Sequence, residues 1–110
     1  MNPMHNFFDL TGVKAQSAEV FEELLKGDRV RVERIVSKGQ VTPAGEWDDQ
    51  DWDEWVMVVS GKAVLELEGS PPMKMASGDY LLIPAHCRHR VNFTSRRPEC
   101  IWLAIHGMLV

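Results

Sequence analysis

The stretch at residues 55–94 reads WVMVVSGKAVLELEGSPPMKMASGDYLLIPAHCRHRVNFT, and it decides the fold. Short runs rich in Val, Leu, Ile and Met alternate there with turn sequences such as Ser60-Gly61 and Ser77-Gly78-Asp79. Runs of this length, separated by Gly, Pro, Ser and Asp, are typical of antiparallel strands joined by tight turns. No helical pattern interrupts them, so the stretch predicts a series of neighbouring strands.

The same pattern continues on both sides of this stretch. RVRVERIVS at residues 29–37 precedes it, and CIWLAIH at residues 100–106 follows it. With the runs inside 55–94, these segments predict about seven short strands and no helix between them. That arrangement indicates an all-β sandwich or small barrel.

The N-terminal region departs from the strand pattern. The segment SAEVFEELLK at residues 17–26 has its apolar residues at the spacing of a helical stripe. Ser17 suits an N-cap, and Gly27 follows as a terminator. We therefore predict a short N-terminal helix within a helical segment, residues 1–28, that precedes a β domain over residues 29–110.

Composition limits the class of protein. The chain has 110 residues, the usual size of one domain, and a formal charge of −4, which disfavours nucleic acid as a partner. No apolar run approaches the ~20 residues of a membrane-spanning helix, and the N-terminus lacks the pattern of a signal peptide. Cys87 and Cys100 form no disulfide framework, so we expect a cytoplasmic protein without a membrane partner.

Two strand segments are apolar at both odd and even positions. They are Trp55–Val59 and Ile101–Ile105. A strand with one face in water should alternate polar and apolar residues, so both faces of these strands are expected to be covered. One short helix cannot cover that area. A homodimer is therefore the expected assembly.

Two segments carry candidate ligands for a metal ion. EWDDQDWDE at residues 46–54 holds six carboxylates, and PAHCRH at residues 84–89 holds two histidines. Carboxylate and imidazole together suit Mn, Fe, Zn or Ni. Cys87 lies between the two histidines and could be a soft ligand or nucleophile, but no second cysteine is near, which favours a small turn residue.

These residues and spacings resemble the cupin family. The first cupin motif ends in a Glu followed, after six residues, by a Gly, as Glu54 and Gly61 do here. The second motif places a Gly, five residues, a Pro and then a His five positions later, as Gly78, Pro84 and His89 do. The resemblance spans residues 29–106 and implies a cupin double-stranded β-helix, that is, a jelly-roll barrel.

The first cupin motif is incomplete in this chain. Cupins usually hold a divalent metal with three His and one Glu, two of these His coming from a His-x-His pair. That pair falls here on Asp48 and Gln50, or on Trp47 and Asp49, depending on the spacing. The resemblance therefore implies a metal site reduced to Glu54 and His89, with Gln50 or Asp49 as substitutes for the missing histidines. His86 stands where the second motif has Gly.

Strand parity tests the direction of the candidate ligands. If His89 points into the barrel, then Val91 and Phe93 do too, while the polar residues between them point outwards. The same test on Glu54 places Val56 inside. Both candidate ligands then open onto an apolar interior.

The function that the resemblance implies is a small metal-binding cupin acting on a small, oxygen-rich organic substrate. The metal would serve as a Lewis acid, and an oxygen-rich ligand set with one imidazole favours isomerase, lyase or hydrolase chemistry over dioxygenase chemistry. A non-catalytic small-molecule or metal-binding barrel is the alternative. The residues expected to line the substrate pocket are Trp47, Tyr80, His86, Trp102 and His106.

Overall fold

The computed structural model describes residues 2–13 and 17–110, and these residues form eight β-strands. The strand bounds are β1 Val20–Lys26, β2 Val30–Ser37, β3 Asp53–Ser60, β4 Lys62–Leu67, β5 Met73–Ala76, β6 Tyr80–Ile83, β7 His89–Thr94 and β8 Cys100–Gly107. The described residues include no helix long and apolar enough to cross a membrane. The predicted all-β architecture is confirmed.

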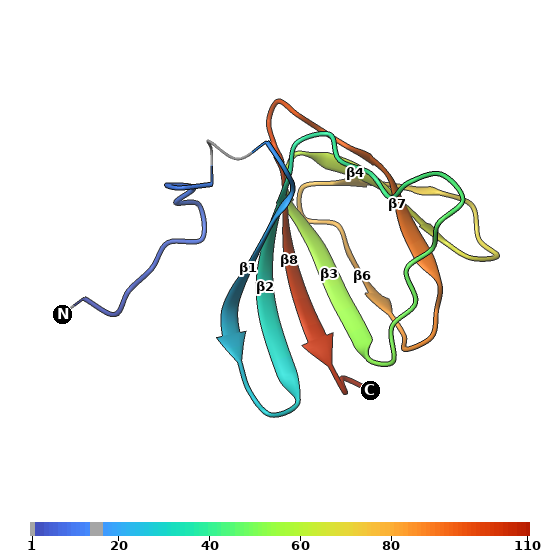
Figure 1. Ribbon diagram of the computed structural model, residues 1–110, viewed down its shortest axis with the longest axis horizontal. Helices are drawn as coiled ribbons and strands as arrows, with labels where there is room; N and C mark the ends of the chain where they lie inside the picture. The colour runs from blue at the N-terminus through green and yellow to red at the C-terminus, as the bar shows by residue number, and fades with distance from the viewer. Residues whose placement is uncertain (1, 14–16) are drawn as a thin grey trace.

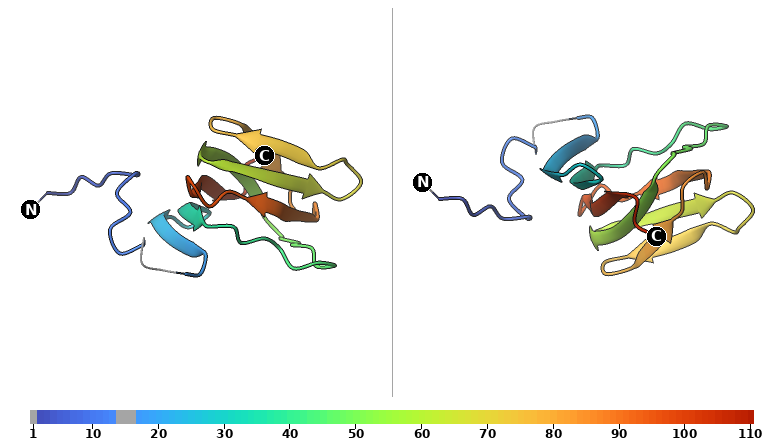
Figure 2. Two further views of the ribbon diagram at one scale, coloured as in Figure 1. Left: turned by 90° about the horizontal axis from the view of Figure 1, so that it is seen from above. Right: turned by 90° about the horizontal axis from the view of Figure 1, so that it is seen from below.

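Two antiparallel sheets form the molecule. One has five strands in the order β1-β2-β8-β3-β6, and the other has three in the order β5-β4-β7. Figures 1 and 2 show the two sheets as layers, with the N-terminal end of the chain lying beyond the larger sheet. The main core lies between the layers and includes Val58, Leu65, Cys100 and Trp102. Burial of these side chains provides the main favourable free energy of folding.

The predicted N-terminal helix is wrong. Residues 20–26 form β1, an edge strand that pairs antiparallel with β2, so they belong to the larger sheet. The register shifts between Glu23 and Leu25, which marks a β-bulge. A bulge adds one residue to a strand and changes its parity, so the apolar spacing resembled a helical stripe. Pairing with β2 overrides the helical propensity of this segment.

The parity prediction holds for part of β7 and fails at its end. His89 and Val91 face the interior between the sheets, as predicted. The register against β4 shifts between Val64 and Leu65, which leaves one extra residue in β7 between Val91 and Phe93. Phe93 therefore faces outwards and is 49% exposed. A bulge of this kind reverses every side chain beyond it.

The turn between β3 and β4 depends on Gly61. This glycine has a φ of 81°, a conformation that other residues rarely adopt. A Cβ added to it would lie 2.6 Å from the carbonyl oxygen of Glu99 and 2.5 Å from Oγ of Ser95. Close backbone contact therefore requires glycine here, and the turn carries the chain from one sheet to the other.

Candidate functional site

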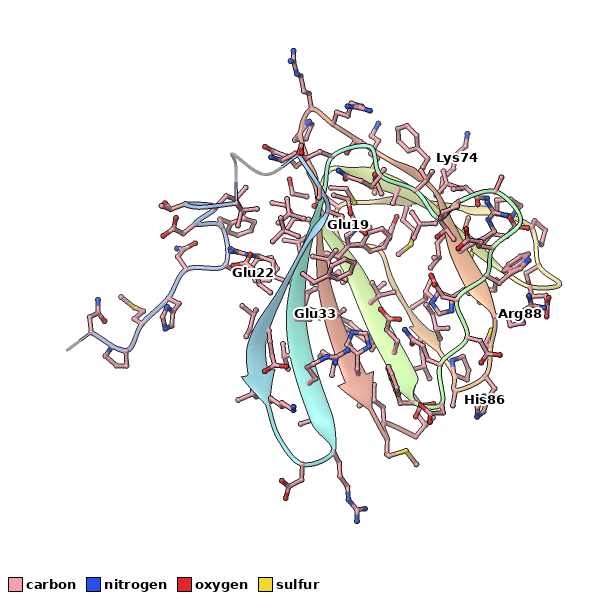
Figure 3. All side chains as sticks on the ribbon, viewed as in Figure 1. Glu19, Glu22, Glu33, Lys74, His86 and Arg88 are labelled. Atoms are coloured by element: carbon pink, nitrogen blue, oxygen red, sulfur yellow. The ribbon has the colours of Figure 1, made fainter. Side chains whose placement is uncertain are left out.

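A cavity of about 390 Å³ opens between the two sheets. Both sheets and the connection from β2 to β3 supply its walls; this connection is the green segment that crosses in front of the barrel in Figure 1. Figure 3 labels two of the lining residues, Glu19 and Glu33. The lining residues are Glu19, Phe21, Glu33, Ile35, Gln40, Val41, Thr42, Pro43, Glu46, Asp48, Gln50, Glu54, Val56, Leu65, Ile83, His89, Val91, Trp102 and His106.

Backbone hydrogen bonds bring the two ligand-bearing segments of the sequence together. The amide of Asp48 donates to the carbonyl of His89 at 2.8 Å, and the amide of His89 donates back to Asp48 at 3.0 Å. The amide of His86 donates to the carbonyl of Gln50 at 2.7 Å. The acidic segment before β3 therefore lies against the start of β7.

Glu54 and His89 meet inside the cavity, as the sequence predicted. Both are buried, and Oε1 of Glu54 lies 3.7 Å from Nε2 of His89. That separation is too long for a hydrogen bond. The other ring nitrogen, Nδ1, lies 3.0 Å from the carbonyl oxygen of Cys87. A carbonyl can only accept, so the proton of the neutral ring is on Nδ1, and Nε2 presents its lone pair to Glu54.

The electrostatic environment of Glu54 favours its neutral form. Burial raises the pKa of Glu54 above its usual range, and the nearby charge of Glu33 raises it further. His106, His89 and a hydrogen bond from Gln50 act in the opposite direction, but the pKa remains raised. A cation in the cavity would favour the carboxylate form.

A second imidazole, His106, lies on the other side of Glu54. Its Nε2 is 3.2 Å from Oε1 of Glu33 and 4.0 Å from Oε2 of Glu54. The indole N–H of Trp52 donates to Nδ1 of His106 at 3.2 Å. Two imidazoles and two carboxylates thus lie at one end of the cavity.

Sequence reasoning missed Glu33 and Trp52. In the segment at 29–37, valines alternate with charged residues, a pattern that normally points the valines inwards. The reverse holds: Glu33 faces the cavity, while Val32 pairs with Ile105 on the outer side of the sheet. One sequence signal favoured this direction: Ile35 is apolar and shares the parity of Glu33, so a buried Ile35 places Glu33 on the inner side of the sheet as well. Trp52 precedes β3 and could not be placed without the structure.

The other predicted site residues lie in different places. Trp102 lines the cavity, whereas Asp49 and His86 pair with each other at 3.4 Å with side chains 51% and 70% exposed. Trp47 lies under the guanidinium groups of Arg88 and Arg90. Tyr80 is 64% exposed and packs on Trp55 outside the barrel. These four residues, Trp47, Asp49, Tyr80 and His86, do not line the cavity.

His86 has a conformation that explains its place in the motif. Its φ is 63°, in the left-handed region that glycine adopts most readily. The second cupin motif has Gly at this position. His86 therefore forms the turn before β7, where its ring is exposed and reaches Asp49 instead of the cavity.

Comparisons with known proteins agree with this architecture. The model of the cupin domain family matches residues 32–106. A solved structure from Ralstonia eutropha JMP134, provisionally named a mannose-6-phosphate isomerase, is 45% identical, with a TM-score of 0.89 over 96% of this chain and 98% of that one. A cupin superfamily protein from Desulfitobacterium hafniense DCB-2 is 18% identical, with a TM-score of 0.71 over 84% and 80%.

A further solved structure with the same fold is that of KdgF from Halomonas sp.. It is 16% identical, with a TM-score of 0.71 over 87% of this chain and 85% of that one. No curated protein matches the chain. The family match covers most of the eight-stranded double sheet described above, including Glu54, His89 and the cavity between them. The chain belongs to the cupin family.

Proposed function

We propose that this cupin binds a divalent metal ion through Glu54, His89 and Gln50 and catalyses proton transfer, as in an isomerase or lyase, on a small oxygen-bearing organic molecule. One observation carries the proposal. Nε2 of His89 faces the carboxyl group of Glu54 at 3.7 Å inside a cavity, and no hydrogen bond joins the two groups.

The residues present fit a divalent ion. Two ligand atoms that each lie about 2.1 Å from one ion are separated by roughly 3 to 4 Å, as these two are. Oε1 of Gln50 is buried without a hydrogen-bond partner and lines the same cavity. Among the described residues no three His, Cys, Asp or Glu side chains are grouped to hold a metal, so the third protein ligand would be this amide. Nitrogen and oxygen donors suit Mn, Zn, Fe or Ni.

The remaining polar residues suit proton transfer. A bound divalent ion would polarise an oxygen atom of the substrate as a Lewis acid. Nε2 of His106 lies beside the carboxylate of Glu33, so this pair could take a proton from one carbon of the substrate and return one to its neighbour. Val56, Leu65 and Ile83 line the same cavity, which limits access of water to the transferred proton.

Metal content tests the binding step. We expect about one ion per chain in the untagged protein by inductively coupled plasma mass spectrometry, after loading with Mn²⁺ or Zn²⁺ and desalting. Glu54→Ala and His89→Ala should lose the ion. Asp49→Asn is the matched control, because Asp49 belongs to the same acidic segment as Glu54 but lies outside the cavity. A wild-type protein that does not retain metal after loading would contradict the proposal.

A non-catalytic binding barrel is the second candidate function. The absence of the His-x-His pair supports it, because a site with fewer protein ligands can hold a ligand without the geometry that catalysis needs. Deuterium exchange separates the two functions. In D₂O the enzyme should incorporate deuterium at carbon in a substrate, whereas a binding barrel should bind the same molecule without exchange.

We also place the protein in the cytoplasm. Both cysteines are free thiols, Cys87 partly buried and Cys100 buried, which supports a reducing compartment.

A further inference from the structure

The wall of the cavity carries negative charge. Five carboxylates line it, whereas its lining residues in the described chain include no Lys and no Arg. The five are Glu19, Glu33, Glu46, Asp48 and Glu54. The two imidazoles, His89 and His106, are the other titratable groups of the wall. Apart from the two imidazoles, every titratable side chain that an entering ligand meets on the described wall is therefore a carboxyl group.

The carboxylates form two groups along the cavity. Glu33 and Glu54 lie at the imidazole end, where the proposed metal would offset part of their charge. The other three, Glu19, Glu46 and Asp48, which we call the outer carboxylates, come from the segment before β1 and from the β2–β3 connection, and Glu46 and Asp48 are exposed to solvent. Burial raises the pKa of Glu19, and the charge of Asp48 raises it further, while the hydrogen bond that the Ser37 hydroxyl donates to Glu19 acts in the opposite direction.

The nearby arginines do not line the cavity. Arg31 faces the same side of the sheet as His106, but its Nε lies 3.9 Å from Glu33, and Arg31 does not line the cavity. Arg88 donates to Glu68 at 2.9 Å on the exposed surface. Arg90 lies over the ring of Trp47. None of these three forms a cationic pocket wall of the kind that binds a phosphate group.

We infer that the cavity selects its ligand by charge: it accepts a neutral or cationic molecule with hydroxyl or amino groups and rejects one that carries a phosphate group. The inference deepens the proposed function, because it names the substrate class of the same site. Hydroxyl and amino groups can donate to the outer carboxylates, and the side chains of Gln40 and Thr42 supply neutral partners. A phosphate would be repelled by Glu19, Glu46 and Asp48, and the described residues that line the cavity include no Lys or Arg to pair with it.

This charge pattern bears on the similar structure from Ralstonia eutropha JMP134, whose provisional name specifies a sugar phosphate. The two chains are 45% identical, but the described residues that line this cavity include no Lys or Arg to pair with a phosphate group. We therefore expect this cavity to bind a sugar phosphate weakly.

Three sugars with one skeleton test the inference. Mannosamine, mannose and mannose 6-phosphate differ at neutral pH chiefly in charge, being cationic, neutral and anionic. Binding to the full chain is followed by NMR through the ring signals of His89, His106 and Trp102, at low and at high salt. We expect mannosamine to bind at least as tightly as mannose, and mannose 6-phosphate roughly tenfold or more weakly than mannose. High salt should reduce the difference in affinity between the three sugars, because Glu46 and Asp48 are exposed to solvent.

Charge-reversal variants test whether the difference in affinity between the sugars arises from the carboxylates of the cavity. Asp48→Lys should strengthen binding of mannose 6-phosphate relative to mannose, because it places a cation on the cavity wall. Asp28→Lys makes the same charge change in the β1–β2 turn, away from the cavity, and should leave the order unchanged. Arg31→Gln should also leave the order of the three affinities unchanged, because Arg31 does not line the cavity.

Several results would overturn the inference. The inference is wrong if mannose 6-phosphate binds most tightly of the three sugars, or if Arg31→Gln abolishes its binding. It is also wrong if none of the three sugars shifts the ring signals of His89, His106 and Trp102. The series is repeated on His89→Ala and on chelator-treated protein. The charge order should persist in both, so a failed metal proposal and a failed charge inference give different results.

Discussion

The indole of Trp52 determines which nitrogen of His106 carries the proton. Its N–H can only donate, and it donates to Nδ1 of His106 at 3.2 Å. The proton of the neutral ring is therefore on Nε2, which lies 3.2 Å from Oε1 of Glu33. The edge-on packing of the two rings, 6.4 Å between centroids, holds this geometry. Trp52 is thus a positioning residue for the His106–Glu33 pair.

Replacing the indole of Trp52 should allow His106 to adopt both of its neutral tautomers. In Trp52→Phe we expect the Nε2–H form, dominant in the wild type, to become a mixture of both forms, as measured from the ring ¹⁵N shifts. Stability should fall by about 0.5–1.5 kcal/mol for the lost hydrogen bond. Trp55→Phe is the control, because Trp55 packs on Tyr80 outside the barrel and should leave the tautomer unchanged. A mixed population in the wild type would contradict this role.

Asp53 should make stability depend on pH. Its carboxylate accepts from the amides of Ala85 and Leu109, both at 2.9 Å, and from Val110 at 3.2 Å. These hydrogen bonds lower the pKa of Asp53 below 3.8, so its contribution is present above that value and is lost as the pH falls through the folded pKa. We expect Asp53→Asn to lower the urea midpoint at pH 7 and to approach the wild type in acid. An equal difference at both pH values would refute the assignment.

The two cysteines should differ in reactivity. Burial, and then the charge of Glu19, raise the pKa of Cys100 to about 12, so at pH 8 roughly one molecule in ten thousand carries its thiolate. Cys87 is only partly buried. We expect a disulfide reagent to label one thiol per native chain and both after unfolding. Cys87→Ser should remove the native labelling; labelling that persists in this variant would show that Cys100 is accessible.

The outer face of the five-stranded sheet should form a homodimer interface. Half-buried apolar side chains lie there in adjacent rows: Ile105 pairs with Val32 and Trp55, and Met57 pairs with Leu103 and Tyr80. Such a continuous apolar face marks an interaction site. We expect light scattering to give about twice the monomer mass of 12.5 kDa.

The variant Tyr80→Glu tests that interface, because it places a charge on an exposed position of this face without disturbing the core. It should shift the protein towards monomer, whereas Lys74→Glu, on the other sheet, should not. A wild-type protein that is monomeric at the highest soluble concentration would argue against the interface.

The strands between residues 29 and 107 could be predicted from the sequence, whereas the β-bulges could not. The seven runs between residues 29 and 107 are strands, because period-two patterning and turn residues are local properties of the chain. The segment at 20–26 was predicted as a helix and is a strand. Its bulge, and that in β7 before Phe93, depend on the neighbouring strand, so no local pattern reveals them.

Motif spacing and strand parity are local properties of the chain, so the sequence alone predicts the all-β architecture, the cupin resemblance and the meeting of Glu54 with His89. What surrounds that pair depends on the tertiary structure. Glu33 and Trp52 come from segments about twenty residues apart, and both reach His106 through the register of β2, β3 and β8. Register between distant strands arises from packing of the whole sheet, so no local pattern of the sequence reveals it.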